Sequence, residues 1–195
     1  MDKVILPRER MNSSVSIKNE TLTMLGPKSG MIYLTLSKNG YVVERREYKN
    51  VVVRSASILT ARLFKNNLEP SHGAFLWAVG VGAGDSSPGN FDLQNPPAAT
   101  IDQTTLRSEL VRKQYSSTNF VDSDGAQSST PTNIVDFSVT FTENEAVGPL
   151  TEMGLFGGDA DEEIPNSGTL ITYRTFAVFN KPAGSTLNLL WRLTF

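Results

Sequence analysis

The C-terminal segment is the feature that most constrains the fold of this chain. From Leu187 to Phe195, large apolar residues occupy every second position, and mostly polar residues lie between them. This two-residue period is typical of a β-strand with one buried face. Chain ends are usually polar and frayed, whereas this chain ends on Phe195. We therefore expect the terminus to be held in a sheet of a compact β module that serves as a building block.

The segments Met31–Leu36 and Tyr41–Tyr48 have apolar residues typical of two further strands, and Lys38-Asn39-Gly40 lies between them. Asn-Gly is a strong hairpin signal because both central residues of a type I′ turn need a positive φ. Strands are also expected in a set of later segments: Ala74–Val81, Leu106–Tyr115, Ile134–Thr142, Glu152–Phe156 and Thr169–Phe179. Of these, Ala74–Val81 is almost wholly apolar and is predicted to be a central strand that is buried on both faces. For Leu106–Tyr115, which carries alternating charges, a short helix is the alternative and a strand is favoured.

Only one helix is expected. Its apolar positions repeat with a helical period between Ala56 and Asn66, after a possible N-cap at Ser55. Together these elements predict an all-β fold, a two-sheet β-sandwich of seven or eight strands with one short α-helix at an edge or between the sheets. The expected core consists of Leu34, Leu59, Leu63, Phe75, Trp77, Val79, Phe137, Val139, Leu155, Tyr173, Leu189, Trp191 and Leu193.

The first 28 residues are predicted to form an N-terminal arm, and residues 29–195 the sandwich domain. Gly26-Pro27-Lys28-Ser29-Gly30 separates the two. The arm is either a disordered leader or a tether that orders on a neighbouring subunit. A long loop from Gly82 to Thr100 is a second candidate contact region, and the acidic loop Asp159–Glu163 is a third. In the arm and the long loop the interface candidates are Arg8, Arg10, Val15, Ile17, Gly82, Asp85, Phe91 and Leu93.

Composition excludes several classes of function. The net charge of −2 and the pI of about 5.5 argue against a nucleic-acid partner. The chain has no cysteine, which excludes disulfides, thiolate metal sites and a cysteine nucleophile. It has neither the apolar region of a signal peptide nor an apolar run of ~18 residues. We expect a soluble protein that is made in the cytoplasm and has no membrane partner.

No motif indicates catalysis or a cofactor. His72 is the only histidine, and a connector role is favoured over a catalytic one. Gly80 to Gly84 lacks the lysine and the helix of a phosphate-binding loop. Asp122-Ser123-Asp124-Gly125 opens like a calcium loop, but Asn133 occupies the twelfth position, where a carboxylate is needed.

The acidic loop offers weak candidates for a divalent-cation site, and simple solvation is the favoured interpretation. The candidates are Asp159, Asp161, Glu162 and Glu163. Paired carboxylates for glycoside hydrolysis are not indicated. Trp77 and Trp191 occupy core-type strand positions, so they are interpreted as core residues and not as platforms for sugars.

Several short motifs are spread over roughly residues 31–195. They are Asn50–Val53 leading into Leu59–Phe64, Trp77–Gly82, Leu150–Phe156, Gly168–Ile171 with Arg174–Phe176, Asn180-Lys181, and Leu187–Phe195. Together these motifs resemble those of small virion proteins of tailed bacteriophages. The insert Ser71–Phe75 and Met153 depart from the pattern, since a small residue is usual at the latter position.

The resemblance implies a non-enzymatic virion component without catalytic residues, cofactors or a small-molecule substrate. We expect a homo-oligomer that contacts itself and other virion proteins at the tail, neck or baseplate, and that is assembled in the host cytoplasm. Capsid decoration is one alternative. A receptor- or glycan-binding module and a cell-wall hydrolase are the others, although the sequence shows no triad and no zinc-ligand set for hydrolysis.

Overall fold

The computed structural model describes residues 27–65, 72–80, 92 and 94–195, with only the backbone of 72–80. These residues form ten strands and one helix. In chain order the elements are β1 Ser29–Lys38, β2 Tyr41–Lys49, β3 Val51–Val52, α1 Arg54–Phe64, β4 His72–Gly80, β5 Glu109–Gln114, β6 Ser117–Phe120, β7 Ile134–Phe141, β8 Gly148–Gly158, β9 Thr169–Lys181 and β10 Ser185–Thr194.

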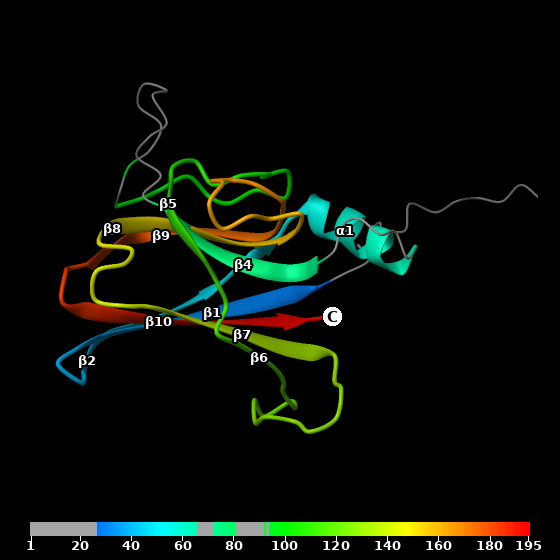
Figure 1. Cartoon of the computed structure of the whole chain (residues 1–195), viewed down its shortest axis with the longest axis horizontal. Coiled ribbons are helices and arrows are strands. Elements are labelled where there is room, and N and C mark those ends of the chain that lie inside the picture. Colours follow the sequence, from blue (N-terminus) through cyan, green and yellow to red (C-terminus); the bar gives the residue numbers. More distant parts are fainter. Residues whose placement is uncertain (1–26, 66–71, 81–91, 93) are drawn as a thin grey trace, which may run out of the picture.

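The strands form two antiparallel sheets packed face to face (Figure 1). One sheet has the order β2-β1-β10-β7-β6 and the other has the order β3-β9-β8-β4-β5. The expected all-β two-sheet sandwich is therefore confirmed, with ten strands in the described residues instead of seven or eight. The additional strands include β3 and β6, which are too short to show a clear period in the sequence.

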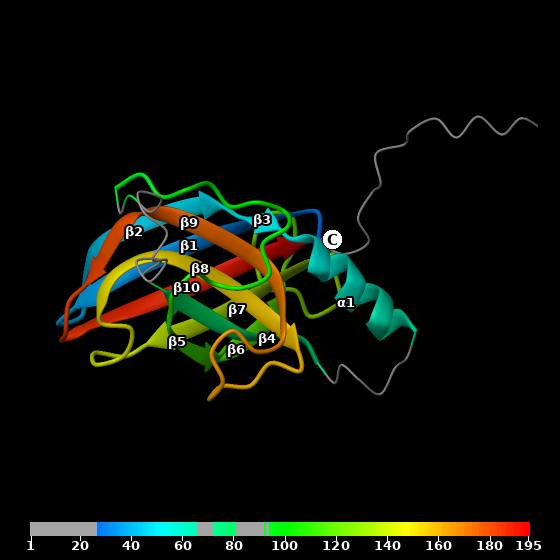
Figure 2. The ribbon, with the colours of Figure 1, turned by 90° about the horizontal axis from the view of Figure 1, so that it is seen from above.

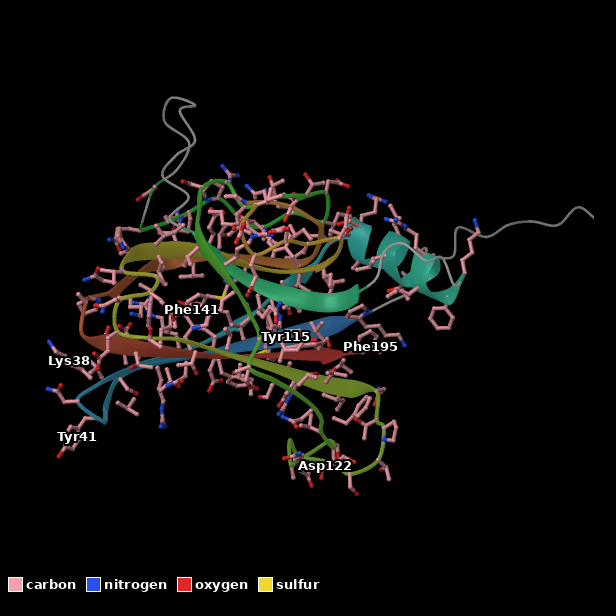
Figure 3. The ribbon with its side chains drawn as sticks, in the orientation of Figure 1. Lys38, Tyr41, Tyr115, Asp122, Phe141 and Phe195 are labelled. Atoms are coloured by element: carbon pink, nitrogen blue, oxygen red, sulfur yellow. The ribbon has the colours of Figure 1, made fainter. Side chains whose placement is uncertain are left out.

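The hairpin between β1 and β2 has the predicted turn. Asn39 and Gly40 have φ angles of 51° and 79°, which is the left-handed geometry that an Asn-Gly type I′ turn requires. The pairing of β1 with β2 shifts register close to this turn, between Leu36 and Ser37. The hairpin projects from the end of the sandwich opposite α1 (Figure 3), and Tyr41 at its tip is largely exposed.

The final strand β10 lies at the centre of its sheet, between β1 and β7. Its alternation gives the main core its central row of side chains, formed by Leu187, Leu189, Trp191 and Leu193, all almost fully buried. Trp191 is thus a core residue, as the sequence predicts. Phe141 of β7 also lies between the two sheets (Figure 3).

The sheet that contains β8 is buried on both of its faces. The last nine residues of β8 are all buried. Met153 and Leu155 belong to the main core, whereas Phe156 joins a second cluster with Leu106 and Tyr173 on the outer side. The segment before β5 and the loop between β8 and β9 cover this outer side (Figure 2). Burial on both faces accounts for the apolar residues and glycines that follow one another from Met153 to Gly158.

Strand β4 is an interior strand of its sheet, as the sequence predicted, and it lies between β8 and β5, next to the middle strand β8. The apolar composition of a strand indicates whether its two faces are covered, but it does not give the position of the strand in the sheet. The predicted core residues Phe75, Trp77 and Val79 lie in β4, whose side chains fall outside the described part of the structure.

The helix begins at Arg54 and not after Ser55. The N-cap is Val53, which has no side-chain cap. Instead, the N–H of Val53 donates to Ile171 O at 3.1 Å and the N–H of Arg54 to Ile101 O at 2.8 Å. Ser55 lies within the first turn, where its hydroxyl donates to Leu170 O at 2.6 Å. Backbone contacts across the fold thus replace the side-chain cap that the local sequence predicted.

The two sheets are also joined at one edge by an ion pair. Lys113 of β5 contacts Glu145, in the turn after β7, with an N–O distance of 2.8 Å, and it donates to Thr140 O of β7. The N–H of Thr142 donates to the same carboxylate. The hydrogen bond from Lys113, followed by that from the backbone of Thr142, lowers the pKa of Glu145 below its ordinary value.

The lowered pKa predicts the pH dependence of the variant Glu145→Gln. This pair stabilises the fold above the ordinary carboxyl pKa of 4.5, and its contribution is lost as the pH falls through the lowered folded-state pKa. Since both side chains are more than one-third exposed, we expect a loss of less than about 1 kcal/mol at pH 7. Urea unfolding should show the difference from wild type vanishing below the folded-state pKa. Glu143→Gln in the same turn controls for loss of one charge, and a pH-independent difference for Glu145→Gln would contradict the prediction.

Candidate functional site

An apolar groove lies at the end of the sandwich where α1 and the two described chain ends meet (Figure 2). Its volume is about 260 Å³. The helix contributes Leu59, Leu63 and Phe64 to its wall, and Pro27 and Phe195 line it from the first and last described residues. Thr60 also faces it, but its hydroxyl donates to Ala56 O at 2.9 Å within the helix. The groove therefore presents an apolar surface.

The sandwich forms the floor of the groove. Phe137 of β7 and Leu193 of β10 reach it from one sheet, and Ile171 of β9 reaches it from the other. All three are buried and belong to the main core. The groove is thus an opening of the core at this end, so an apolar side chain that entered it would contact the core directly.

The helix is only partly covered by the sheets, and this leaves one wall of the groove exposed. Ala56 and Leu59 in the first two turns are buried, but Leu63 is 40% exposed and Phe64 is 81% exposed. The prediction that Leu63 is a core residue is therefore wrong. Its helical period is correct, but the last turn of α1 extends past the end of the sheets, where no strand covers it (Figure 1).

The alternation of the final strand also placed Phe195 on the buried face, and this is wrong. Phe195 is 42% exposed and lies outside β10. Its backbone is nevertheless held. The N–H of Phe195 donates to Asn133 O at 2.9 Å, and its carbonyl accepts from Asn133 Nδ2 at 3.2 Å. The ring continues the inward face of β10, but it meets the groove instead of an opposing strand (Figure 3).

On the outer side of the other sheet, a buried carboxylate anchors the covering segment. Glu152 of β8 is fully buried. It accepts hydrogen bonds from the N–H groups of Arg107 at 3.0 Å and Ser108 at 2.8 Å, and from the hydroxyl of Tyr173 at 2.5 Å. Burial, and then the Glu152 charge, raise the pKa of Tyr173 far above its ordinary value. The hydroxyl thus stays protonated and donates to the carboxylate.

A buried ion pair holds the neighbouring loop. Glu109 and Arg112 of β5 are each 3% exposed, with an N–O distance of 2.6 Å. Arg112 also donates to Asp161 O and to the hydroxyl of Ser167, each at 2.7 Å. Its guanidinium stacks over the ring of Phe156, 4.8 Å from the centroid. All these partners come from the chain itself, so the network fastens the loop to the sheet.

The acidic loop is not arranged as a cation site. Asp159, Asp161, Glu162 and Glu163 are all exposed, and the described residues contain no group of three or more acidic or histidine side chains that could hold a metal ion. Asp161 Oδ1 accepts from the N–H of Glu163 at 2.7 Å, and Glu162 Oε1 accepts from the N–H of Gln114 at 2.7 Å. Two of the four carboxylates thus shape the loop and join it to β5.

The calcium-like opening at Asp122 is a turn. Asp122 Oδ1 accepts from the N–H groups of Asp124 at 3.0 Å and Ala126 at 2.9 Å. Gly125 has a φ of +84°, which favours glycine. The sequence therefore forms a self-contained loop in which this carboxylate bonds to its own backbone.

The predicted interface residues cannot be placed relative to the groove. Arg8, Arg10, Val15, Ile17, Gly82, Asp85, Phe91 and Leu93 lie outside the described residues. His72 begins β4 and does not lie in a connector, but its side chain is also outside the described part. The sequence analysis did not identify the groove, whose only local signal is the apolar pair Leu63-Phe64 at the end of the helix.

In the part of the chain that the structure describes, no helix has the length and apolar character needed to cross a membrane. No protein-family model matches the sequence, and no curated protein is significantly similar to it.

The buried ion pair predicts a contrast between two Glu→Gln variants. Glu109→Gln leaves the buried Arg112 without its countercharge, so we expect a loss of about 3 kcal/mol in the free energy of unfolding. Glu44→Gln disrupts the more exposed pair with Arg46 and should cost less than about 1 kcal/mol. Urea unfolding of the two variants measures both values. Equal losses would contradict a structural role for the buried pair.

Proposed function

We propose that this protein is a non-enzymatic structural component of a tailed-bacteriophage virion. In this proposal it is a homo-oligomeric protein of the tail, neck or baseplate that is assembled in the host cytoplasm. The observation that carries the proposal is the open apolar groove at the end of a sandwich in which the buried Glu152 and the buried pair of Glu109 and Arg112 are hydrogen-bonded within the chain.

The chemistry of the groove favours a protein partner over a small molecule. Small-molecule sites combine apolar walls with a few convergent polar groups that fix the orientation of the ligand. The lining here is almost wholly apolar, and the Thr60 hydroxyl is already bonded to its own helix. Exposed apolar surface of this kind commonly marks a protein interface. In a symmetric assembly the same contact is repeated in every subunit.

The residues that carry the resemblance to phage virion proteins have structural positions that suit this role. Leu150–Phe156 lies in β8, Gly168–Phe176 in and just before β9, and Leu187–Phe195 in and just after β10. Within these strands Glu152 anchors a covering segment, and Lys181 at the end of β9 donates to Thr142 O at 2.8 Å and to Ser185 O at 2.7 Å. The motifs thus supply a scaffold, which supports a structural role over a catalytic one.

The glycan- and receptor-binding alternative gains no support from the acidic loop, because Asp161 and Glu162 accept backbone hydrogen bonds. Capsid decoration requires the same kind of contact surface as a tail or neck protein. The experiment must therefore separate these two positions in the particle.

Electron microscopy of phage particles with gold-labelled antibody against this chain tests the proposal. We expect label at the tail, neck or baseplate, with several gold particles clustered at one position because the protein is an oligomer. As the control, the antibody is first incubated with an excess of purified protein. This competition should remove the label from the particles. Label spread over the shell would replace the tail assignment by capsid decoration. Unlabelled particles, with the chain absent from their denatured protein content, would overturn a virion role.

A further inference from the structure

One wall of the groove lies where the N-terminal segment joins the sandwich. Pro27, the first described residue, forms part of its wall. The next residue is fixed to the sheet, since the N–H of Lys28 donates to Thr194 O at 2.7 Å. Twenty-six residues precede Pro27. A segment of this length therefore ends at an apolar groove with exposed side chains.

We infer that residues 12–25 of one copy dock in the groove of a neighbouring copy. This rests on the proposed homo-oligomeric function and names the partner of that surface. We call residues 12–25 the docking segment. It contains Val15, Ile17, Leu22, Met24 and Leu25 among mostly small polar residues. Such a segment cannot form a core of its own, but its five apolar side chains suit a groove whose lining is almost wholly apolar.

Docking would cover the apolar groups that the sandwich leaves exposed. Leu63, Phe64 and Phe195 are 40%, 81% and 42% exposed, and all three line the groove. Removing such surface from water is the main favourable contribution to protein association. The groove has ten lining residues, which is few beside a stable interface between rigid bodies, with about 20–30 residues on each side. A segment that lies in the groove and continues along the neighbour enlarges the contact.

The position of Pro27 favours the groove of a neighbour over the chain's own groove. Leu25 is only two residues from Pro27, so in its own chain it stays within about 7 Å of the groove wall. Val15 and Ile17 could reach the same groove only after the chain reversed direction. When the chain is extended, Val15 can lie up to about 40 Å and Leu22 up to about 17 Å from Pro27, so the docking segment can reach a subunit that packs directly beside this end of the sandwich. The same step repeated around a ring would satisfy every groove.

Self-association of the full chain tests this inference through matched substitutions in α1. Leu63→Glu places a carboxylate in the groove, whereas Ile58→Glu makes the same change on the same helix outside it, beside Ile101. Ile58 is 57% exposed, so neither change removes a fully buried side chain. We expect Leu63→Glu to weaken self-association at least about 100-fold in sedimentation equilibrium, because the charge must be desolvated. Ile58→Glu should associate like wild type.

Two further variants cover the case in which Leu63→Glu fails to fold. Phe64→Glu alters a ring that is 81% exposed and that the fold does not require. Leu22→Glu alters the docking segment and leaves the groove intact. Both should weaken self-association as Leu63→Glu does, with an unchanged circular dichroism spectrum. An oligomer that keeps its size in all three variants would overturn the inference and leave the homo-oligomeric function intact. A wild-type chain that is monomeric at all concentrations would overturn both the inference and the proposed oligomer.

A cysteine experiment distinguishes docking in a neighbour from docking in the same chain. The natural chain has no cysteine, so the double variant Leu22→Cys with Thr60→Cys has only the two introduced thiols. After mild oxidation with diamide, we expect a ladder of disulfide-linked chains on a non-reducing gel. Leu22→Cys with Ile58→Cys is the control and should give no ladder. A monomer band that has lost its free thiols would mean that the segment folds back on its own groove, and this would overturn the inference.

Discussion

The structure depends on the burial of one sheet on both of its faces. In β8 and β9 the inward side chains pack against the opposite sheet, and the outward ones pack under the segment before β5 and the loop before β9. Covering segments of irregular backbone bring polar groups with them, and these must be hydrogen-bonded when they are buried. Glu152 meets this need for the backbone at Arg107 and Ser108. The charged residues of this sheet are therefore best understood as structural anchors.

This constraint also explains how far the sequence predicted the fold. The Asn39-Gly40 hairpin and the alternation from Leu187 to Leu193 were correctly predicted, because turn chemistry and two-residue periods are local properties. The N-cap was not, because the first N–H groups of α1 bond to Ile101 and Ile171. Because those partners are distant in sequence, no local pattern can predict them. The roles of Glu152 and Arg112 were missed for the same reason.

The two mispredicted core residues have a common cause. Leu63 and Phe195 both follow the correct period of their element, and both lie where the sandwich ends. Periodicity predicts which face of an element is apolar, but it does not predict whether another element extends far enough to cover that face. The two residues that were wrongly predicted both line the groove. Residues that have the apolar pattern of a core but remain exposed commonly belong to an interaction surface.

The two outer regions of the sandwich thus differ in how their apolar surface is covered. Over β8 and β9 the chain provides its own cover, which is fastened by Glu152 and by the buried pair of Glu109 and Arg112. At the end beside α1, the described chain provides only a short helix that leaves Phe64 exposed. A cover that is supplied by another subunit makes full burial conditional on assembly, because the apolar groups are removed from water only when the neighbour is present. In the proposed homo-oligomer, each copy would therefore gain stability on assembly, as the proposed structural role in a virion requires.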